Sequence, residues 1–112
     1  MTPETRIKRD IITYLDSLAP LCFHFAVHNM GYGKRGIPDR IACYRGYFIG
    51  IEIKAEKGQP TPYQLDRNRE IEATKGVAIV ARTVEDVQAA IRLIDARCEE
   101  ANHTVWLAQA TR

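Results

Sequence analysis

Residues 36–54 read GIPDRIACYRGYFIGIEIK, and this stretch decides the fold. The dipeptide Arg45-Gly46 lies between two runs of branched and aromatic residues, which predicts two strands joined by a tight hairpin turn. In the second run, three isoleucines occupy every second position and therefore share one face of the strand. We expect that face to lie in the core, so Glu52 and Lys54 project from the other side.

The charged residues of this hairpin suggest a site. Asp39, on the neighbouring strand, can reach the same patch as Glu52 and Lys54. Two carboxylates beside a lysine suit Mg²⁺ that keeps several waters and takes a phosphate oxygen as a further ligand. Such a metal can polarise phosphorus and lower the pKa of a bound water, which Lys54 could orient. The alternative is a surface salt-bridge cluster on an exposed sheet face.

The rest of the chain predicts the element order α-β-β-β-α-β-α. Thr2 and Pro3 favour a helix start, and Thr61 and Pro62 favour another, with Gly76 as its left-handed cap. The first helix should run to about residue 18, and the second over 63–74. Strands are predicted over 21–29 and 77–82, and a third helix from 83, whereas the segment from about 99 is ambiguous. A strand, a helix and a strand in succession favour a parallel crossover, and so a mixed sheet with helices packed on it.

Length and composition are those of one globular domain, 1–112, because 112 residues allow a single core and 46% of them are hydrophobic. Residues 30–75 hold nine Lys or Arg against six Asp or Glu, although the whole chain has a net charge of only +2. This bias makes a phosphate backbone a plausible partner. A solvated surface of mixed charge is the other interpretation.

Several classes of protein are not indicated. The charged N-terminus lacks the apolar stretch of a signal peptide, and no run is long enough to span a membrane, so we expect a cytoplasmic protein. The three cysteines are scattered, which favours neither a disulfide framework nor a zinc site and predicts three small core residues. His24 and His28 are more typical of the edge of a core than of a metal site, although they could line the site.

At this point the residues resemble a known family. Pro38-Asp39, followed by Glu52-Ile53-Lys54 after a short hairpin, is similar to the signature of the PD-(D/E)xK nucleases. The fuller pattern resembles the VRR-NUC family over residues 4–82; it consists of G-I-P-D, Gly46, I-E-I-K, Gly58, Thr61 and Gln64. The resemblance implies an α/β, restriction-endonuclease-like core with a mixed central sheet flanked by helices.

The resemblance also implies roles for single residues. Asp39 and Glu52 would be metal ligands together with the Ile53 carbonyl oxygen, and Lys54 would be the catalytic lysine. Gln64 would contact the metal-bound water or the scissile phosphate. Glu4 could complete the site. For Gln64 and Glu4 the alternatives are ordinary helix-start roles.

Basic and aromatic residues near this motif suit phosphate contact and base stacking. The residues we expect to contact DNA are Tyr32, Lys34, Arg35, Arg40, Arg45 and Lys57. The alternative is that these are ordinary surface side chains of a loop and a hairpin.

The function implied by the resemblance is a Mg²⁺- or Mn²⁺-dependent DNA endonuclease of phage or prophage type. Its minimal relatives resemble Holliday-junction resolvases, for which paired cuts require two active sites and so a symmetric dimer. A flap or nicking nuclease would carry the same motif. A DNA-binding module without catalysis is the alternative from another class, but it predicts a degraded motif, whereas Asp39, Glu52 and Lys54 are all present.

Overall fold

A four-stranded sheet in the order β1-β2-β3-β4 forms the centre of the molecule. The structure is a computed structural model that describes residues 1–28 and 33–110. The strands are β1 (Cys22–Ala26), β2 (Arg40–Tyr44), β3 (Tyr47–Ile53) and β4 (Val77–Ala81). The pairs β1–β2 and β2–β3 are antiparallel, whereas β3–β4 is parallel. The predicted mixed sheet and element order are therefore confirmed.

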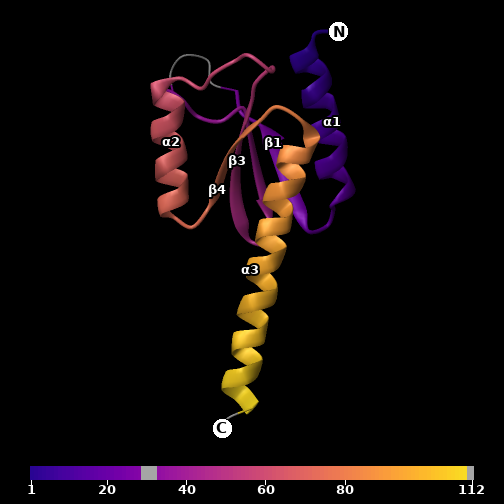
Figure 1. The fold of residues 1–112 in the computed structure, drawn as a ribbon, viewed down its shortest axis with the longest axis vertical. Helices are drawn as coiled ribbons and strands as arrows, with labels where there is room; N and C mark the ends of the chain where they lie inside the picture. The colour runs from indigo at the N-terminus through magenta and orange to yellow at the C-terminus, as the bar shows by residue number, and fades with distance from the viewer. Residues whose placement is uncertain (29–32, 111–112) are drawn as a thin grey trace.

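Three helices flank this sheet. Helix α1 (Pro3–Ser17) and helix α3 (Val84–Ala110) pack side by side on one face, and α2 (Pro62–Ala73) lies on the other (Figure 1). The core lies between the sheet and the pair α1 and α3. It contains the three isoleucines of β3 together with residues of both helices, among them Ile11, Leu15, Val87 and Ile94.

The hairpin turn has the backbone that the sequence predicts. Arg45 and Gly46 both have positive φ, 49° and 88°, as a tight turn between antiparallel strands requires. The end of α2 differs from expectation, because Lys75, not Gly76, adopts the left-handed conformation, with φ of 72°. Gly76 is required for another reason: a Cβ there would lie 2.9 Å from the Ile71 side chain.

The segment after residue 98 is helical and forms the second half of α3. This half extends past the rest of the protein, so the molecule measures 56 × 27 × 23 Å (Figure 1). The strand predicted over 21–29 is shorter than expected, because it ends at Ala26. Among the described residues, we find no helix with the length and apolar character needed to cross a membrane.

The cysteine prediction is confirmed only in part. Cys22 is buried in the core and Cys98 packs against it, but Cys43 is exposed. Cys43 lies on β2 between Ala42 and Tyr44, which both face the core, so the alternation of the strand turns it to the other face.

Candidate functional site

Two neighbouring strands bring the motif residues together at one end of the sheet. Asp39 directly precedes β2, and the β2–β3 register pairs Arg40 with Ile51, which places Asp39 beside Glu52. The Oδ2 atom of Asp39 accepts a hydrogen bond from the backbone N–H of Ile53 at 2.8 Å. Its backbone carbonyl accepts another from Val27 at 2.9 Å. The carboxylate is therefore fixed at the end of β3.

Close packing on the face of β3 that carries Glu52 explains Pro38 and Gly50. A Cβ at Gly50 would lie 2.8 Å from both the Pro38 ring and the Ile71 side chain of α2. Only glycine allows this approach, and a glycine inside a strand often marks such contact. Pro38 and α2 thus cover the strand just before Glu52.

Glu52 is a buried carboxylate with an unsatisfied oxygen. Its relative exposure is 3%, and Oε2 has no hydrogen-bond partner within the described part of the chain. The Lys54 ammonium lies 4.0 Å from Oε1. Burial raises the pKa of Glu52 to about 8, and a side-chain hydrogen bond with Asp39 and the negative charge of Asp39 act in the same direction. The positive charge of Lys54 opposes this rise. A salt-bridge cluster on an exposed sheet face does not fit this burial.

Glu4 and Gln64 occupy different surroundings. The negative charge of Glu4, in the first turn of α1, also raises the pKa of Glu52, so the two groups are close enough to interact. Gln64 forms a capping box: its Oε1 accepts from the Thr61 N–H at 2.8 Å, and its own N–H donates to the Thr61 hydroxyl. The helix-start interpretation of Gln64 is thus confirmed, and its side-chain oxygen is occupied.

A loop after Lys54 is held in place by a residue that the sequence did not reveal. The Arg82 guanidinium donates to the carbonyls of Ala55 at 2.8 Å and Glu56 at 3.2 Å. Gly58 returns towards the lysine, since a Cβ there would lie 3.4 Å from the Lys54 side chain. No local sequence pattern indicates this role for Arg82, because Arg82 follows β4 and is far from the loop along the chain.

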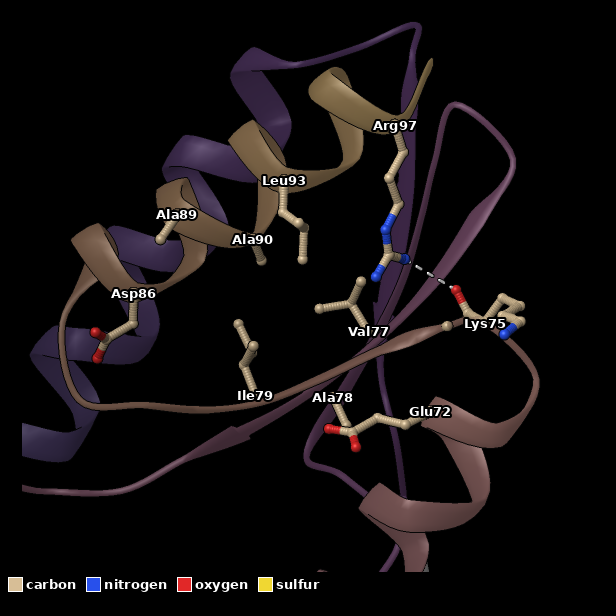
Figure 2. A pocket seen from close by; sticks show the side chains of 11 residues that line it. Glu72, Lys75, Val77, Ala78, Ile79, Asp86, Ala89, Ala90, Leu93 and Arg97 are labelled. Carbon is tan, nitrogen blue, oxygen red and sulfur yellow. Dashed lines mark hydrogen bonds between the residues drawn. The ribbon is translucent and has the colours of Figure 1, made fainter. Parts of the chain in front are cut away.

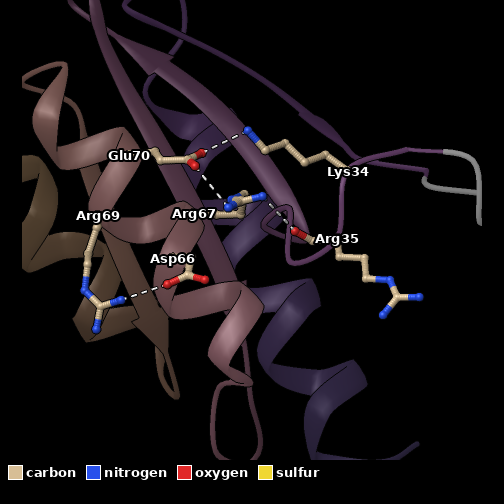
Figure 3. Close-up of polar contacts among 6 residues, drawn as sticks. All are labelled: Lys34, Arg35, Asp66, Arg67, Arg69 and Glu70. Atoms are coloured by element: carbon tan, nitrogen blue, oxygen red, sulfur yellow. Dashed lines mark hydrogen bonds and ion pairs between the residues drawn. The ribbon is translucent and has the colours of Figure 1, made fainter.

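Basic side chains gather where the segment 33–36 meets α2 (Figure 3). Lys34 forms an ion pair with Glu70 at 3.2 Å, and Arg67 bonds the same carboxylate at 3.0 Å. The Arg35 guanidinium lies over the Tyr63 ring, 5.3 Å from its centroid, and has no carboxylate partner among the described residues. The sequence pattern did not indicate Tyr63 and Arg67 as part of this surface.

The other predicted DNA-contact residues are dispersed. Arg40 is only 8% exposed and donates to the Nδ1 atom of His24 at 2.9 Å, so it does not lie on an open surface. Arg45 lies at the opposite end of the hairpin, bonded to Asp95 at 2.9 Å. Lys57 is exposed in the loop after Lys54. Tyr32 lies outside the described residues.

The two histidines are not brought together at this site. The Nε2–H of His24 donates to the Asp16 carboxylate of α1 at 2.6 Å, and its other nitrogen accepts from Arg40. This bridge joins α1 to β2, as expected for a residue at the edge of a core. His28 is exposed and lies beyond β1.

The described residues contain no group of three or more His, Cys, Asp or Glu side chains arranged to hold a metal ion. The site has instead two adjoining carboxylates, of which one carries a buried oxygen without a partner. Such a pair fits Mg²⁺, which commonly binds one or two protein carboxylates and keeps its other ligands as water or phosphate.

Known proteins resemble this chain in sequence over part of its length and in fold over most of it. No protein-family model matches the sequence. The chain is 33% identical over 63 residues to "Putative nuclease p44" of Acyrthosiphon pisum secondary endosymbiont phage 1. That match covers 55% of this chain and 63% of the relative, so the chain spans less than two thirds of the curated protein that it matches.

Two solved structures are similar over most of the chain. One, described as a VRR_NUC domain, has a TM-score of 0.66 at 21% identity and covers 82% of this chain and 97% of its own. The other, a VRR_NUC domain protein, has a TM-score of 0.61 at 20% identity and covers 83% of this chain and 88% of its own. The resemblance seen in the sequence is therefore confirmed in three dimensions: this chain has the fold of the VRR-NUC domains.

Proposed function

We propose that this protein is a metal-dependent DNA endonuclease that hydrolyses phosphodiester bonds. One observation carries the proposal: Asp39, just before β2, and Lys54, just after β3, meet Glu52 at the end of β3, where Glu52 is buried with a free oxygen. A buried carboxylate without a partner is costly to the fold, and such costs are concentrated at functional sites. The likeness to a phage protein named as a nuclease supports the same activity.

The residues fit Mg²⁺ or Mn²⁺ as the cofactor. Asp39 and Glu52 would hold the ion together with the Ile53 carbonyl, and Glu4, in the first turn of α1, would complete the site. A divalent ion bound there supplies a Lewis acid for the phosphate and lowers the pKa of a water. Its charge would also offset the burial and the Asp39 charge that make the ionisation of Glu52 unfavourable.

Lys54 and Asp39 would position the water and the substrate. Lys54 extends from the end of β3 with its side chain partly exposed, so its ammonium can contact both Glu52 and a phosphate. There it would orient the attacking water and offset the negative charge that develops on the phosphate. Asp39, fixed by the Ile53 N–H, would keep its position while substrate binds.

DNA binding would use the basic surface beside the site. Lys34 and Arg35, on the segment that packs against α2, and Lys57, in the loop after Lys54, are predicted contact residues with exposed side chains. Contacts of this kind recognise the phosphate backbone and not the base sequence. We therefore expect selection by DNA shape, with branched DNA, such as a Holliday junction, as the preferred substrate and a homodimer as the active form. A flap or nicking nuclease with the same site is the second candidate.

The first test compares the purified protein with its Lys54→Ala variant on labelled linear duplex, nicked, flap and four-way-junction DNA. We expect cleavage with Mg²⁺ or Mn²⁺, none with EDTA, and a loss of at least about a hundredfold in the variant, because one charge at the reacting phosphate is removed. Lys75→Ala, which removes an equal charge at the far end of α2, is the matched control and should cleave normally.

The outcomes separate the candidates. Paired cuts confined to the junction would support a resolvase, and cuts spread over flaps or nicks would support the second candidate. Undiminished cutting by Lys54→Ala would contradict the assigned role of the lysine. Metal-independent binding of DNA without any cleavage would instead favour a non-catalytic module.

A further inference from the structure

Arg82 holds the loop that follows Lys54. This arginine comes directly after β4, and its Nη1 atom donates to the carbonyl oxygens of Ala55 at 2.8 Å and Glu56 at 3.2 Å. The Ala55 carbonyl also accepts from the backbone N–H of Gly58 at 2.9 Å, and this bond closes a turn. A carbonyl oxygen has two lone pairs and can accept both bonds. One guanidinium nitrogen therefore holds the turn at the carbonyl that closes it.

Arg82 is itself fixed at its backbone. The Asp86 carboxylate, in the first turn of α3, accepts from the backbone N–H groups of Arg82 at 2.8 Å and Thr83 at 3.2 Å. Arg82 is partly buried and forms no ion pair with a carboxylate within the described part of the chain. Its guanidinium is therefore used to hold backbone carbonyls and not to balance an acidic side chain.

The loop in turn lies against the proposed catalytic lysine. The backbone N–H of Lys54 donates to the Ala81 carbonyl at 3.1 Å, so the end of β4 fixes the point from which the lysine side chain extends. Gly58 lies beside the stem of this side chain, since a Cβ there would be 3.4 Å from Cδ and 3.5 Å from Cβ of Lys54. The Lys54 ammonium lies 4.0 Å from Oε1 of Glu52. A shift of the loop would therefore let the stem, and with it the ammonium, move away from Glu52.

We propose that Arg82 is a positioning residue for the hydrolysis: by holding the loop 55–58, it keeps the Lys54 ammonium beside Glu52 and the reacting phosphate. The inference rests on the proposed function, because the position of Lys54 affects a rate only where this lysine acts on a substrate. A displacement of about 1 Å at a reacting centre can lower a rate about a hundredfold. Among the described residues, the Arg82 side chain bonds the loop and not Asp39 or Glu52, so its loss should leave metal binding unchanged.

The first measurement is single-turnover cleavage, with Mg²⁺, of the labelled DNA that the wild type cuts best. Arg82→Met keeps an apolar stem without a donor, so we expect its rate to be about ten- to a hundredfold lower. Arg82→Lys again supplies several donors on one nitrogen, as Nη1 does, and should recover part of the rate. The affinity for DNA, measured by anisotropy, should change far less than the rate, and the stabilisation by Mg²⁺ should not change.

The matched control is Arg97→Met. Arg97 is also a partly buried arginine that donates to a backbone carbonyl, that of Lys75 at 3.2 Å, but this carbonyl lies just before the start of β4 (Figure 2). Arg97 lines the groove between β4 and α3 and has no contact with the loop 55–58 among the described hydrogen bonds. This variant should cleave at the wild-type rate. Melting curves confirm that each variant is folded at the assay temperature, and Arg82→Lys carries the comparison if Arg82→Met is not.

A second measurement follows the loop without any substrate. A lysine-specific protease cuts after Lys54 or Lys57, and its rate on the folded protein reports how often this loop opens. We expect cutting at these two lysines to be about tenfold faster in Arg82→Met than in the wild type, because the loop has lost both bonds to the guanidinium. Arg97→Met should be cut there at the wild-type rate.

Cleavage of DNA by Arg82→Met at the wild-type rate would overturn the proposal, and so would a loop that resists the protease in this variant. A variant that binds DNA more weakly but cuts the bound DNA at the normal rate would overturn it as well, since Arg82 would then be a DNA contact. The proposed function fails separately: a wild type that cuts no DNA contradicts the nuclease, whereas normal cleavage by a variant with an opened loop contradicts the positioning role alone.

Discussion

Single residues of the site reveal a conflict between folding and function, most clearly at Glu52. The folded protein buries this carboxyl group, and its pKa rises to about 8 from the ordinary value of 4.5. Between these two pH values the folded state keeps a proton that the unfolded state has released. The stability of the metal-free protein should therefore fall as the pH rises from about 5 to 8.

The substitution Glu52→Gln should remove that cost. The amide has the same shape and no charge, so we expect the variant to be more stable than the wild type at pH 8 by about 1–4 kcal/mol, and by much less at pH 5. Thermal melts in EDTA at several pH values measure the difference. The same variant should lose Mg²⁺-dependent stabilisation. A wild type that gains stability between pH 5 and 8 relative to Glu52→Gln would contradict this account.

Arg35 is the clearest candidate for a direct phosphate contact, because it is exposed and lies on the Tyr63 ring without a carboxylate partner in the described chain. Arg35→Gln should weaken DNA binding about tenfold and lower the slope of log affinity against log salt by about 1. Fluorescence anisotropy at several salt concentrations measures both. Arg69→Gln, at an arginine paired with Asp66, should change the slope much less. Equal slopes for both variants would argue against a special role for Arg35.

At the scale of elements, the join between the segment 33–36 and α2 places the basic surface. Gly36 has φ of 80°, and a Cβ there would lie 2.6 Å from the Gln64 backbone nitrogen. The segment can therefore approach the first turn of α2 only because Gly36 has no side chain. The capping box of Thr61 and Gln64 fixes the same turn from inside the helix.

Two glycines with similar backbones allow a controlled test of that approach. Gly36→Ala should destabilise the protein by about 2 kcal/mol or more, since it adds a backbone clash to the strain of positive φ. Gly46→Ala should cost only about 1 kcal/mol, because it has φ of 88° but nothing within 4 Å of the added Cβ. Chemical denaturation measures both. Equal costs would show that backbone strain, and not close packing, explains the need for Gly36.

Much of this arrangement could be predicted from the sequence, because it depends on local rules. Strand alternation and the hairpin turn are sufficient to bring Asp39, Glu52 and Lys54 together. The same rules, applied further, would have corrected two predictions. Alternation from Asp39 turns Arg40 to the core face, and the hairpin carries Arg45 to the far end of the sheet.

Other features depend on tertiary packing and could not be predicted in this way. The depth at which Glu52 is buried depends on how α2 covers β3, and the support of the loop 55–58 depends on Arg82, which joins it from β4. The sequence of the second half of α3 lacked a clear pattern, and none of its described side chains belongs to the core.

At the scale of the whole molecule, the core and the extended half of α3 are separate parts. Among the side chains that the structure describes, the last one of α3 that packs against the core is Cys98. A chain that ends after residue 98 should therefore fold and melt within a few degrees of the full chain. Circular dichroism with thermal melting measures this. A truncated chain that is unfolded would show instead that the extended half of α3 contributes to the stability of the monomer.

The alternation of core-facing and site-facing side chains along β3 also links correct folding to a correct site. The strand carries the core isoleucines on one face and the Glu52 carboxylate on the other, so a slip of one residue against its neighbours would exchange Ile51 with Glu52. The slipped chain would bury charge against α1 and α3 and could not complete its core. A chain with a misaligned site would therefore also fail to fold, so correct folding and correct placement of the carboxylate are linked.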